Sequence, residues 1–225
     1  FNYEIFVDVV DISGETHSAE TSVRVGYLAI DANVYINEKI DNSKENNISV
    51  SVNNLNGQPE PTDVTVKVYD LIEPLNPKKA RLWTEPDKFI MSKTEHDKYF
   101  QYEIYDKEDL MSNWQKGALL NTNTFNTGKQ TDIKLAANSL QAGAYLIEFT
   151  CKDKNANAIE IKKNFFANSM NDKTPEPKAF AYFNVDKYTA KPNETVQYQI
   201  GSSMTNAYAI IEVAFKGNII EKKIV

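Results

Sequence analysis

The residues best suited to chemistry in this sequence are one cysteine and two histidines. Cys151 lies in the strand-like run 145–153 and is the only cysteine, which excludes a disulfide framework and a cysteine-based metal cluster. A catalytic thiol needs a neighbouring base, but His17 follows a turn at 11–15 and His96 lies in the charged run 93–98. We therefore expect Cys151 to be a core or half-buried thiol and both histidines to be solvated surface residues.

One run of oxygen-bearing side chains has the spacing of a calcium loop. Asp153, Asn155 and Asn157 alternate as the first ligands of such a loop do, but its sixth and twelfth positions hold Ala158 and Asn164 instead of Gly and Glu. The sequence therefore favours a hairpin turn at this place.

Two further charged runs are weak candidates for a site. Adjacent residues of an irregular run, such as Glu95-His96-Asp97, rarely converge on one ion. The carboxylates of 106–109 (Asp106, Glu108 and Asp109) are expected to form a solvated helix start rather than a glycosidase pair. There is no glycine-rich phosphate loop and no Gly-x-Ser-x-Gly elbow. The sequence predicts no enzyme, and it offers no catalytic residues, no metal site and no cofactor site.

Composition indicates a globular chain rich in strands. The net charge is −6 and the pI is near 5.1, which argues against a nucleic-acid partner. Val, Ile and Thr total 49 residues and Tyr plus Phe add 23, a bias typical of half-buried sheets. Asn reaches 24 while Gly is only 8, so turns are expected to be built on Asn. The predicted class is all-β.

The middle of the chain has the pattern of an antiparallel β-sandwich. Three strand-like runs, at 28–36, 47–52 and 63–69, are followed after an interruption by others between 123 and 166. The runs at 47–52 and 63–69 alternate apolar and polar residues almost without fault, which places one face on a core and one in water. The interruption at 72–121 carries prolines, a capping-box pattern at 92–95 and seven aromatic residues.

Similar units recur along the chain, which indicates an array of like domains. A strand beginning at Tyr3 and another beginning at Tyr145 each lead through a polar turn into a new unit. The predicted organisation is a closing hairpin at 1–27, a complete domain at 28–168, a linker at 169–177 and the opening strands of a following domain at 178–225. Because the chain begins in a strand, with no signal peptide, we expect it to be a piece of a longer protein.

Several segments, taken in order, resemble the bacterial alpha-2-macroglobulin family in the form common in Bacteroidetes. They are residues 8–27, 53–59, 81–87, 125–128 and 140–145, and 207–220 resembles the middle of another macroglobulin-like domain. The resemblance implies extracytoplasmic chains of seven-stranded sandwich domains, periplasmic or associated with the outer membrane. It also implies a broad-spectrum protease inhibitor in which a cleaved bait segment triggers a Cys–Gln thioester.

This chain departs from that family at the thioester. Cys151 is followed by Lys152-Asp153-Lys154 instead of the family's Cys-x-Glu-Gln, and no segment resembles a bait. The resemblance therefore implies a structural and interaction segment. Its partners would be neighbouring macroglobulin-like domains of the parent chain, and proteases only through the whole parent protein.

Two further expectations concern surfaces. The aromatic insertion, with Trp83 and Trp114 near its limits, either fastens a long crossover or offers a platform for carbohydrate or peptide. The second use is the alternative function. The apolar strands of 1–27 and 178–225 are expected to leave edges uncovered, so that they pack together or pair between molecules.

Overall fold

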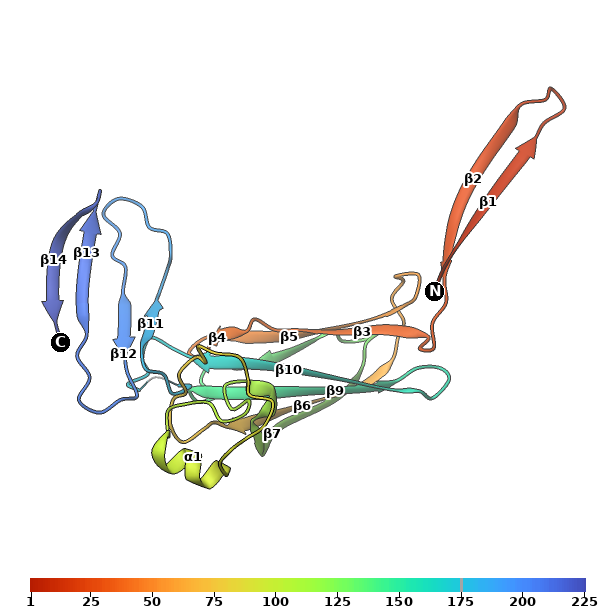
Figure 1. The fold of residues 1–225 in the computed structure, drawn as a ribbon. Coiled ribbons are helices and arrows are strands. Elements are labelled where there is room, and N and C mark those ends of the chain that lie inside the picture. Colours follow the sequence, from red (N-terminus) through yellow and green to blue (C-terminus); the bar gives the residue numbers. More distant parts are fainter. Residues whose placement is uncertain (175) are drawn as a thin grey trace. The chain divides into compact units, whose positions relative to one another are not determined.

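A computed structural model describes residues 1–174 and 176–225 (Figure 1). The chain forms two compact units, one from residues 1–71 and 116–167 and the other from residues 72–115 and 168–225. Pro175, which falls in the predicted linker 169–177, lies outside the described residues.

The described residues form fourteen strands, one α-helix and one 3₁₀ turn. In chain order these are β1 (Asn2–Val10), β2 (Thr16–Arg24), β3 (Ile30–Tyr35), β4 (Lys39–Asp41), β5 (Asn46–Asn54), β6 (Asp63–Ile72), α1 (Lys93–Tyr99), η1 (Met111–Asn113), β7 (Gln115–Asn126), β8 (Asp132–Leu135), β9 (Gly143–Lys152), β10 (Ala158–Asn168), β11 (Tyr182–Val185), β12 (Tyr198–Gly201), β13 (Ile210–Phe215) and β14 (Asn218–Ile224). The fold is all-β, as the composition predicts.

Two sheets of the first unit make a β-sandwich (Figure 1). One has the order β3-β5-β8 and the other the order β4-β10-β9-β6-β7. The pairs β3–β5, β5–β8, β6–β9 and β9–β10 are antiparallel. The sandwich therefore has eight strands, where about seven were expected.

The core lies between these two sheets and follows the alternation of the sequence. Every second residue is buried from Ile48 to Val52 in β5 and from Val64 to Val68 in β6, and the residues between them are half-buried. Opposite β6, the side chain of Phe149 on β9 is fully buried and pairs in register with Val66. Burial of these faces is the main source of stability, at about 25 cal/mol for each Å² of apolar surface removed from water.

One expectation about the strands was wrong. Residues 115–121 were assigned to the interruption, but β7 begins at Gln115. β7 lies at the end of its sheet, and most of its residues are exposed on both faces. An edge strand of this kind has no buried face to impose alternation, so its sequence did not indicate a strand.

Asparagine serves the turns as predicted, although not alone. Asn138, Asn193 and Asn206 have positive φ, and so do Ala156 and Lys216. In the turn after β5, the side chain of Asn54 accepts hydrogen bonds from two backbone N–H groups, of Asn56 and Gln58.

The insertion is held together by its own aromatic and charged side chains. Helix α1 begins with the predicted capping box between Ser92 and Glu95. The Tyr105 ring stacks on Phe89 at 4.4 Å, and its hydroxyl donates to the Met91 carbonyl. These contacts hold the insertion together within itself. The expectation that its aromatic residues pin a long crossover to the sandwich stays a prediction.

Three two-stranded sheets complete the chain: β1–β2, β11–β12 and β13–β14. All eighteen residues of β1 and β2 are exposed. β14 is exposed throughout, and β13 is exposed at all but one residue. The β1–β2 and β13–β14 sheets therefore have no packed face, whereas most residues of β11 and β12 are half-buried.

Candidate functional site

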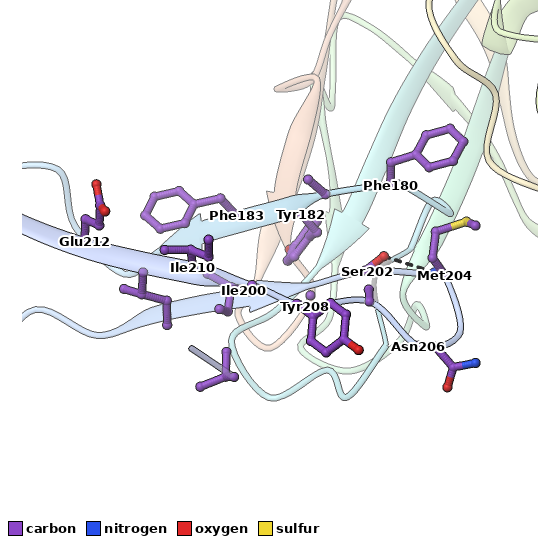
Figure 2. Close-up of a pocket in the computed structure, with 16 residues that line it drawn as sticks. Phe180, Tyr182, Phe183, Ile200, Ser202, Met204, Asn206, Tyr208, Ile210 and Glu212 are labelled. Atoms are coloured by element: carbon purple, nitrogen blue, oxygen red, sulfur yellow. Dashed lines mark hydrogen bonds between the residues drawn. The ribbon is translucent and has the colours of Figure 1, made fainter. Parts of the chain in front are cut away.

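An apolar groove lies between the β11–β12 and β13–β14 hairpins of the second unit (Figure 2). Its volume is about 770 Å³. The lining residues that carry its apolar character are Phe180, Phe183, Ile200, Tyr208, Ile210 and Ile211. Two separate two-stranded sheets supply its walls.

The β11–β12 wall of the groove is a small apolar face. Residues that pair directly across two strands lie on one face, and the register pairs Phe183 with Ile200 and Val185 with Tyr198. The rings of Phe183 and Tyr198 stack at 6.5 Å between centroids. Phe183 is nevertheless 64% exposed, so this face has no cover.

The β13–β14 wall has a similar composition and a single ion pair. Ile210 pairs with Ile224 in the register, and both side chains are largely exposed. The Lys222 ammonium lies 2.7 Å from the Glu212 carboxylate, directly across the hairpin. The groove is therefore apolar with one neutralised pair of charges, which suits an apolar strand better than a charged ligand.

One polar group of the groove is engaged within the turn after β12. Ser202 Oγ accepts a hydrogen bond from the Met204 N–H, the bond drawn in Figure 2. Burial, followed by the charge of Asp172, raises the pKa of Tyr182. Within the described residues, the groove lining contains no histidine or cysteine. The arrangement supports binding and supplies no nucleophile with a base.

The β1–β2 hairpin also has one apolar face. Tyr3, Ile5, Val7 and Val9 alternate along β1, and Val23 of β2 lies opposite Tyr3. Each of these five side chains is 41% to 57% exposed. The hairpin therefore has a surface of the same kind as the groove walls.

Cys151 is the buried thiol that the sequence predicts. It is 7% exposed on β9 and belongs to the core of the sandwich. Burial, and then the charge of Asp153, raises its pKa. A thiol of this kind is a weak nucleophile.

The run at 153–157 is a hairpin turn, as the sequence favours. Both carboxylate oxygens of Asp153 are occupied: Oδ1 accepts from the N–H groups of Asn155 and Asn157, and Oδ2 accepts from Ala29 N–H and Asn157 Nδ2. With four N–H donors around it, this carboxylate fastens the start of the sandwich at Ala29 to the β9–β10 turn. It is a structural group and leaves no oxygen for calcium.

We expect Asp153→Asn to reduce the acid sensitivity of the sandwich. The hydrogen bonds from the Asn157 side chain and from Ala29 lower the pKa of Asp153 from 3.8 to about 2. A lowered pKa means that the carboxylate stabilises the fold above pH 3.8 and loses this contribution as the pH falls towards 2. Thermal unfolding across that range should show a lower melting temperature for the variant near neutrality and a flatter curve in acid. Asp31→Asn, at an exposed position, is the control. If the melting temperatures of Asp153→Asn and of the unsubstituted chain changed in parallel with pH, Asp153 would not have this stabilising role.

The two histidines differ from each other. His17 is exposed, as expected, 3.7 Å from Asp11. His96 was expected to be solvated, but its side chain is only 14% exposed and its ring contacts Phe100 and Tyr105. The aromatic neighbours in the folded insertion, which lie four and nine residues away, bury a histidine that stands in a charged run.

Residues 95–97 do not form a metal site. The Glu95 carboxylate is engaged by Ser92 in the capping box, and His96 Nδ1 lies 3.5 Å from Asp97 Oδ1. A different group, Asp11, Glu15 and His17, brings its ligand atoms within 4.8 Å of one another at the exposed β1–β2 turn. Sequence reasoning missed this group, which the hairpin geometry gathers, but Asp11 Oδ1 already accepts three hydrogen bonds from Ser13 and Glu15.

The 106–109 run is also more engaged than expected. Glu108 is 19% exposed in its side chain, and its carboxylate lies 2.6 Å from Lys93 Nζ. Burial raises its pKa, but the hydrogen bonds from Lys93 and from the Asp106 N–H outweigh this and bring the pKa to about 2. Glu108 is thus a permanently ionised structural group rather than a solvated helix start.

Comparison with known proteins gives similarities in structure only. No protein-family model matches the chain. No curated protein matches it. No helix in residues 1–174 or 176–225 has the length and apolar character of a membrane span.

Three solved structures are similar over the whole of this chain. The tetra-tandem repeat in the extending region of a large adhesion protein is 15% identical with a TM-score of 0.31. Salmonella alpha-2-macroglobulin reacted with methylamine is 13% identical (TM-score 0.30), and Escherichia coli alpha-2-macroglobulin in its native conformation is 12% identical (TM-score 0.29). This chain spans 45%, 13% and 14% of those chains, respectively.

Proposed function

We propose that this chain is a structural and interaction segment of a bacterial, extracytoplasmic alpha-2-macroglobulin-like protease inhibitor. Its task is to hold neighbouring β-sandwich domains together in an array. The proposal is supported by the ordered sequence resemblance and by the combination of one packed sandwich with three two-stranded sheets that expose large apolar side chains.

The uncovered hairpins carry the proposal. A two-stranded sheet is marginally stable in water by itself and needs further strands or a packed face. β1–β2, β11–β12 and β13–β14 are all two-stranded, and each has large apolar side chains on its surface. Contiguous exposed apolar surface of this kind marks an interaction site.

The partner that fits these surfaces is another β-sandwich domain of the same type. Each strand of the β1–β2 and β13–β14 sheets has one partner strand, and an edge strand of this kind can pair through its backbone with an added strand. The groove between β12 and β13 supplies apolar walls for the alternate side chains of such a strand. Neighbouring domains of the parent chain provide strands with this pattern.

Protease trapping is a property of the whole parent in this proposal. Cys151 is buried on a strand and its pKa is raised, so it does not serve as a thioester group. The contribution of this segment is the relative placement of its neighbours.

We expect the isolated chain to associate with itself through the groove. In the absence of a neighbouring domain, two copies can cover each other's exposed sheets. Tyr208 lines the groove and is 87% exposed, whereas Tyr188 is 91% exposed and lies outside it. Tyr208→Ser should weaken association at least about 30-fold, because buried tyrosines at interfaces contribute about 2 kcal/mol or more.

Sedimentation and light scattering over a concentration series measure this association. Tyr188→Ser is the matched control and should associate with the same affinity as the unsubstituted chain. An unsubstituted chain that remains monomeric at every concentration would contradict the proposal. Tyr208→Ser and Tyr188→Ser variants that weaken association equally would also contradict it.

A further inference from the structure

A second, polar pocket lies within the insertion, between the 72–78 segment, α1 and the residues before β7. Its volume is about 530 Å³, within the usual range for small-ligand sites. Charged, amide and aromatic side chains share its lining. The residues that define it are Asn76, Lys93, Asp97, Gln101, Asn113 and Trp114.

The charges of this pocket neutralise one another. Lys93 Nζ lies 2.6 Å from Glu108 and 2.9 Å from Asp97. Lys78, only 9% exposed, donates to the carbonyls of Gln101 and Glu103 at 3.2 and 3.0 Å. The third carboxylate of the lining, Glu73, lies 3.7 Å from Lys178 Nζ. Because both lysines of the lining already have protein acceptors, the pocket offers no unpaired cation with which to hold an anion.

The neutral amides of the pocket are only partly engaged. Asn76 Nδ2 donates to Gln101 Oε1 at 3.4 Å, and Asn113 Nδ2 donates to the Lys107 carbonyl at 3.2 Å. Among residues 1–174 and 176–225, no hydrogen bond engages Gln101 Nε2, Asn76 Oδ1 or Asn113 Oδ1. The pocket therefore keeps both donor and acceptor capacity in uncharged groups.

An indole and aliphatic groups provide the rest of the lining. Trp114 Nε1 donates to the Glu108 carbonyl at 2.7 Å, which fixes the orientation of the half-buried ring. Ile72, Pro74 and Leu75 also line the pocket. Apolar faces next to neutral donors and acceptors match a pyranose ring, which has C–H faces and a rim of hydroxyl groups.

We infer that this pocket binds a short neutral saccharide. The saccharide stacks a sugar face on Trp114 and exchanges hydrogen bonds with the amides of Gln101, Asn76 and Asn113. A free peptide fits less well, because its terminal carboxylate finds no unpaired cation among the lysines of the pocket. This binding is separate from the apolar groove and shares no lining residue with it.

Tryptophan fluorescence of the full chain tests the inference. The chain has two tryptophans, so a Trp83→Phe background leaves Trp114 as the only indole. The probes are maltose, cellobiose, N,N′-diacetylchitobiose and, as the peptide alternative, glycylglycine. We expect a saturable change in Trp114 emission with at least one of the three sugars and none with glycylglycine.

Amide variants then separate binding from a nonspecific effect. Gln101→Ala should weaken the affinity for the sugar about tenfold. This is the loss expected for one hydrogen bond that contributes about 1.4 kcal/mol. Gln58→Ala removes an amide of the same type from an exposed turn and should leave the binding curve unchanged. Circular dichroism of each variant establishes that it is folded.

Three results would overturn the inference. The first is the absence of a saturable change with all three sugars. The second is sugar binding that Gln101→Ala leaves intact. The third is saturable binding of glycylglycine alone, which would assign the pocket to peptides.

Discussion

Phe149→Ala should destabilise the sandwich by about 3–5 kcal/mol, the largest effect expected of a single substitution in this chain. Phe149 is fully buried and is among the largest fully buried side chains. It lies on β9, between Val66 of β6 and Ile161 of β10 in the register. Because neighbouring strands on both sides hold the backbone, the site cannot collapse to fill the cavity.

The single cysteine gives a direct measurement of this effect. Cys151 is buried in the same core, so a thiol reagent reaches it only when the sandwich opens. When the sandwich opens and closes faster than the reagent reacts, the labelling rate is proportional to the population of the open state. Under these conditions Phe149→Ala should speed labelling more than about a hundredfold. Thr150→Ala, at the neighbouring exposed position, is the control. A change of less than about tenfold for Phe149→Ala would show that this ring is not central to the core.

Gly117→Ala should cost about 1–3 kcal/mol, the usual cost of overpacking. A Cβ at Gly117 would overlap the Asp70 carboxylate and lie only 2.8 Å from its Cγ. Asp70 Oδ1 is buried with no hydrogen-bond partner among the described residues, so this carboxylate is already poorly accommodated. The Asp70 side chain occupies the space that a side chain at position 117 would need.

A double-mutant cycle identifies the clash as the cause. Asp70→Ala alone should be nearly neutral, because it removes an unpartnered buried oxygen. Combined with Gly117→Ala, it should restore most of the lost stability, as measured by urea unfolding. If the losses of unfolding free energy of the two single variants added up in the double variant, the cost of Gly117→Ala would instead come from the β7 backbone.

The sandwich was predictable from sequence because its core strands have one buried and one exposed face. In β5 and β6, burial selects every second residue, and that selection appears directly as alternation. The first part of β7, residues 115–121, escaped prediction because an edge strand with little burial is under no such selection. The turn at Asp153 was predictable because its side-chain oxygens are spaced to accept local N–H groups.

The candidate sites were less predictable, because they depend on contacts that only folding creates. The burial of His96 comes from the Phe100 and Tyr105 rings, although its own sequence neighbours are charged. The groove lies between two hairpins. Their strands can be recognised in the sequence, but the sequence does not indicate that the two hairpins lie beside each other. The apolar surfaces themselves were expected, since 1–27 and 178–225 contain apolar strands without enough partners to cover them.

The interaction proposal and the saccharide inference are independent of each other. Tyr208→Ser should leave sugar binding at Trp114 unchanged, since the groove and the polar pocket have separate linings. The proposal of a domain-holding segment makes no use of the polar pocket, and its test requires no ligand.

Hydrogen exchange measured across a concentration series tests the central claim most directly. If the exposed sheets are interaction surfaces, amides of 180–225 and of the β1–β2 hairpin should gain protection as the chain associates, while the core of the sandwich remains unchanged. Tyr208→Ser should abolish the gain in 180–225. A chain that stays monomeric while both segments exchange rapidly at every concentration would contradict the account.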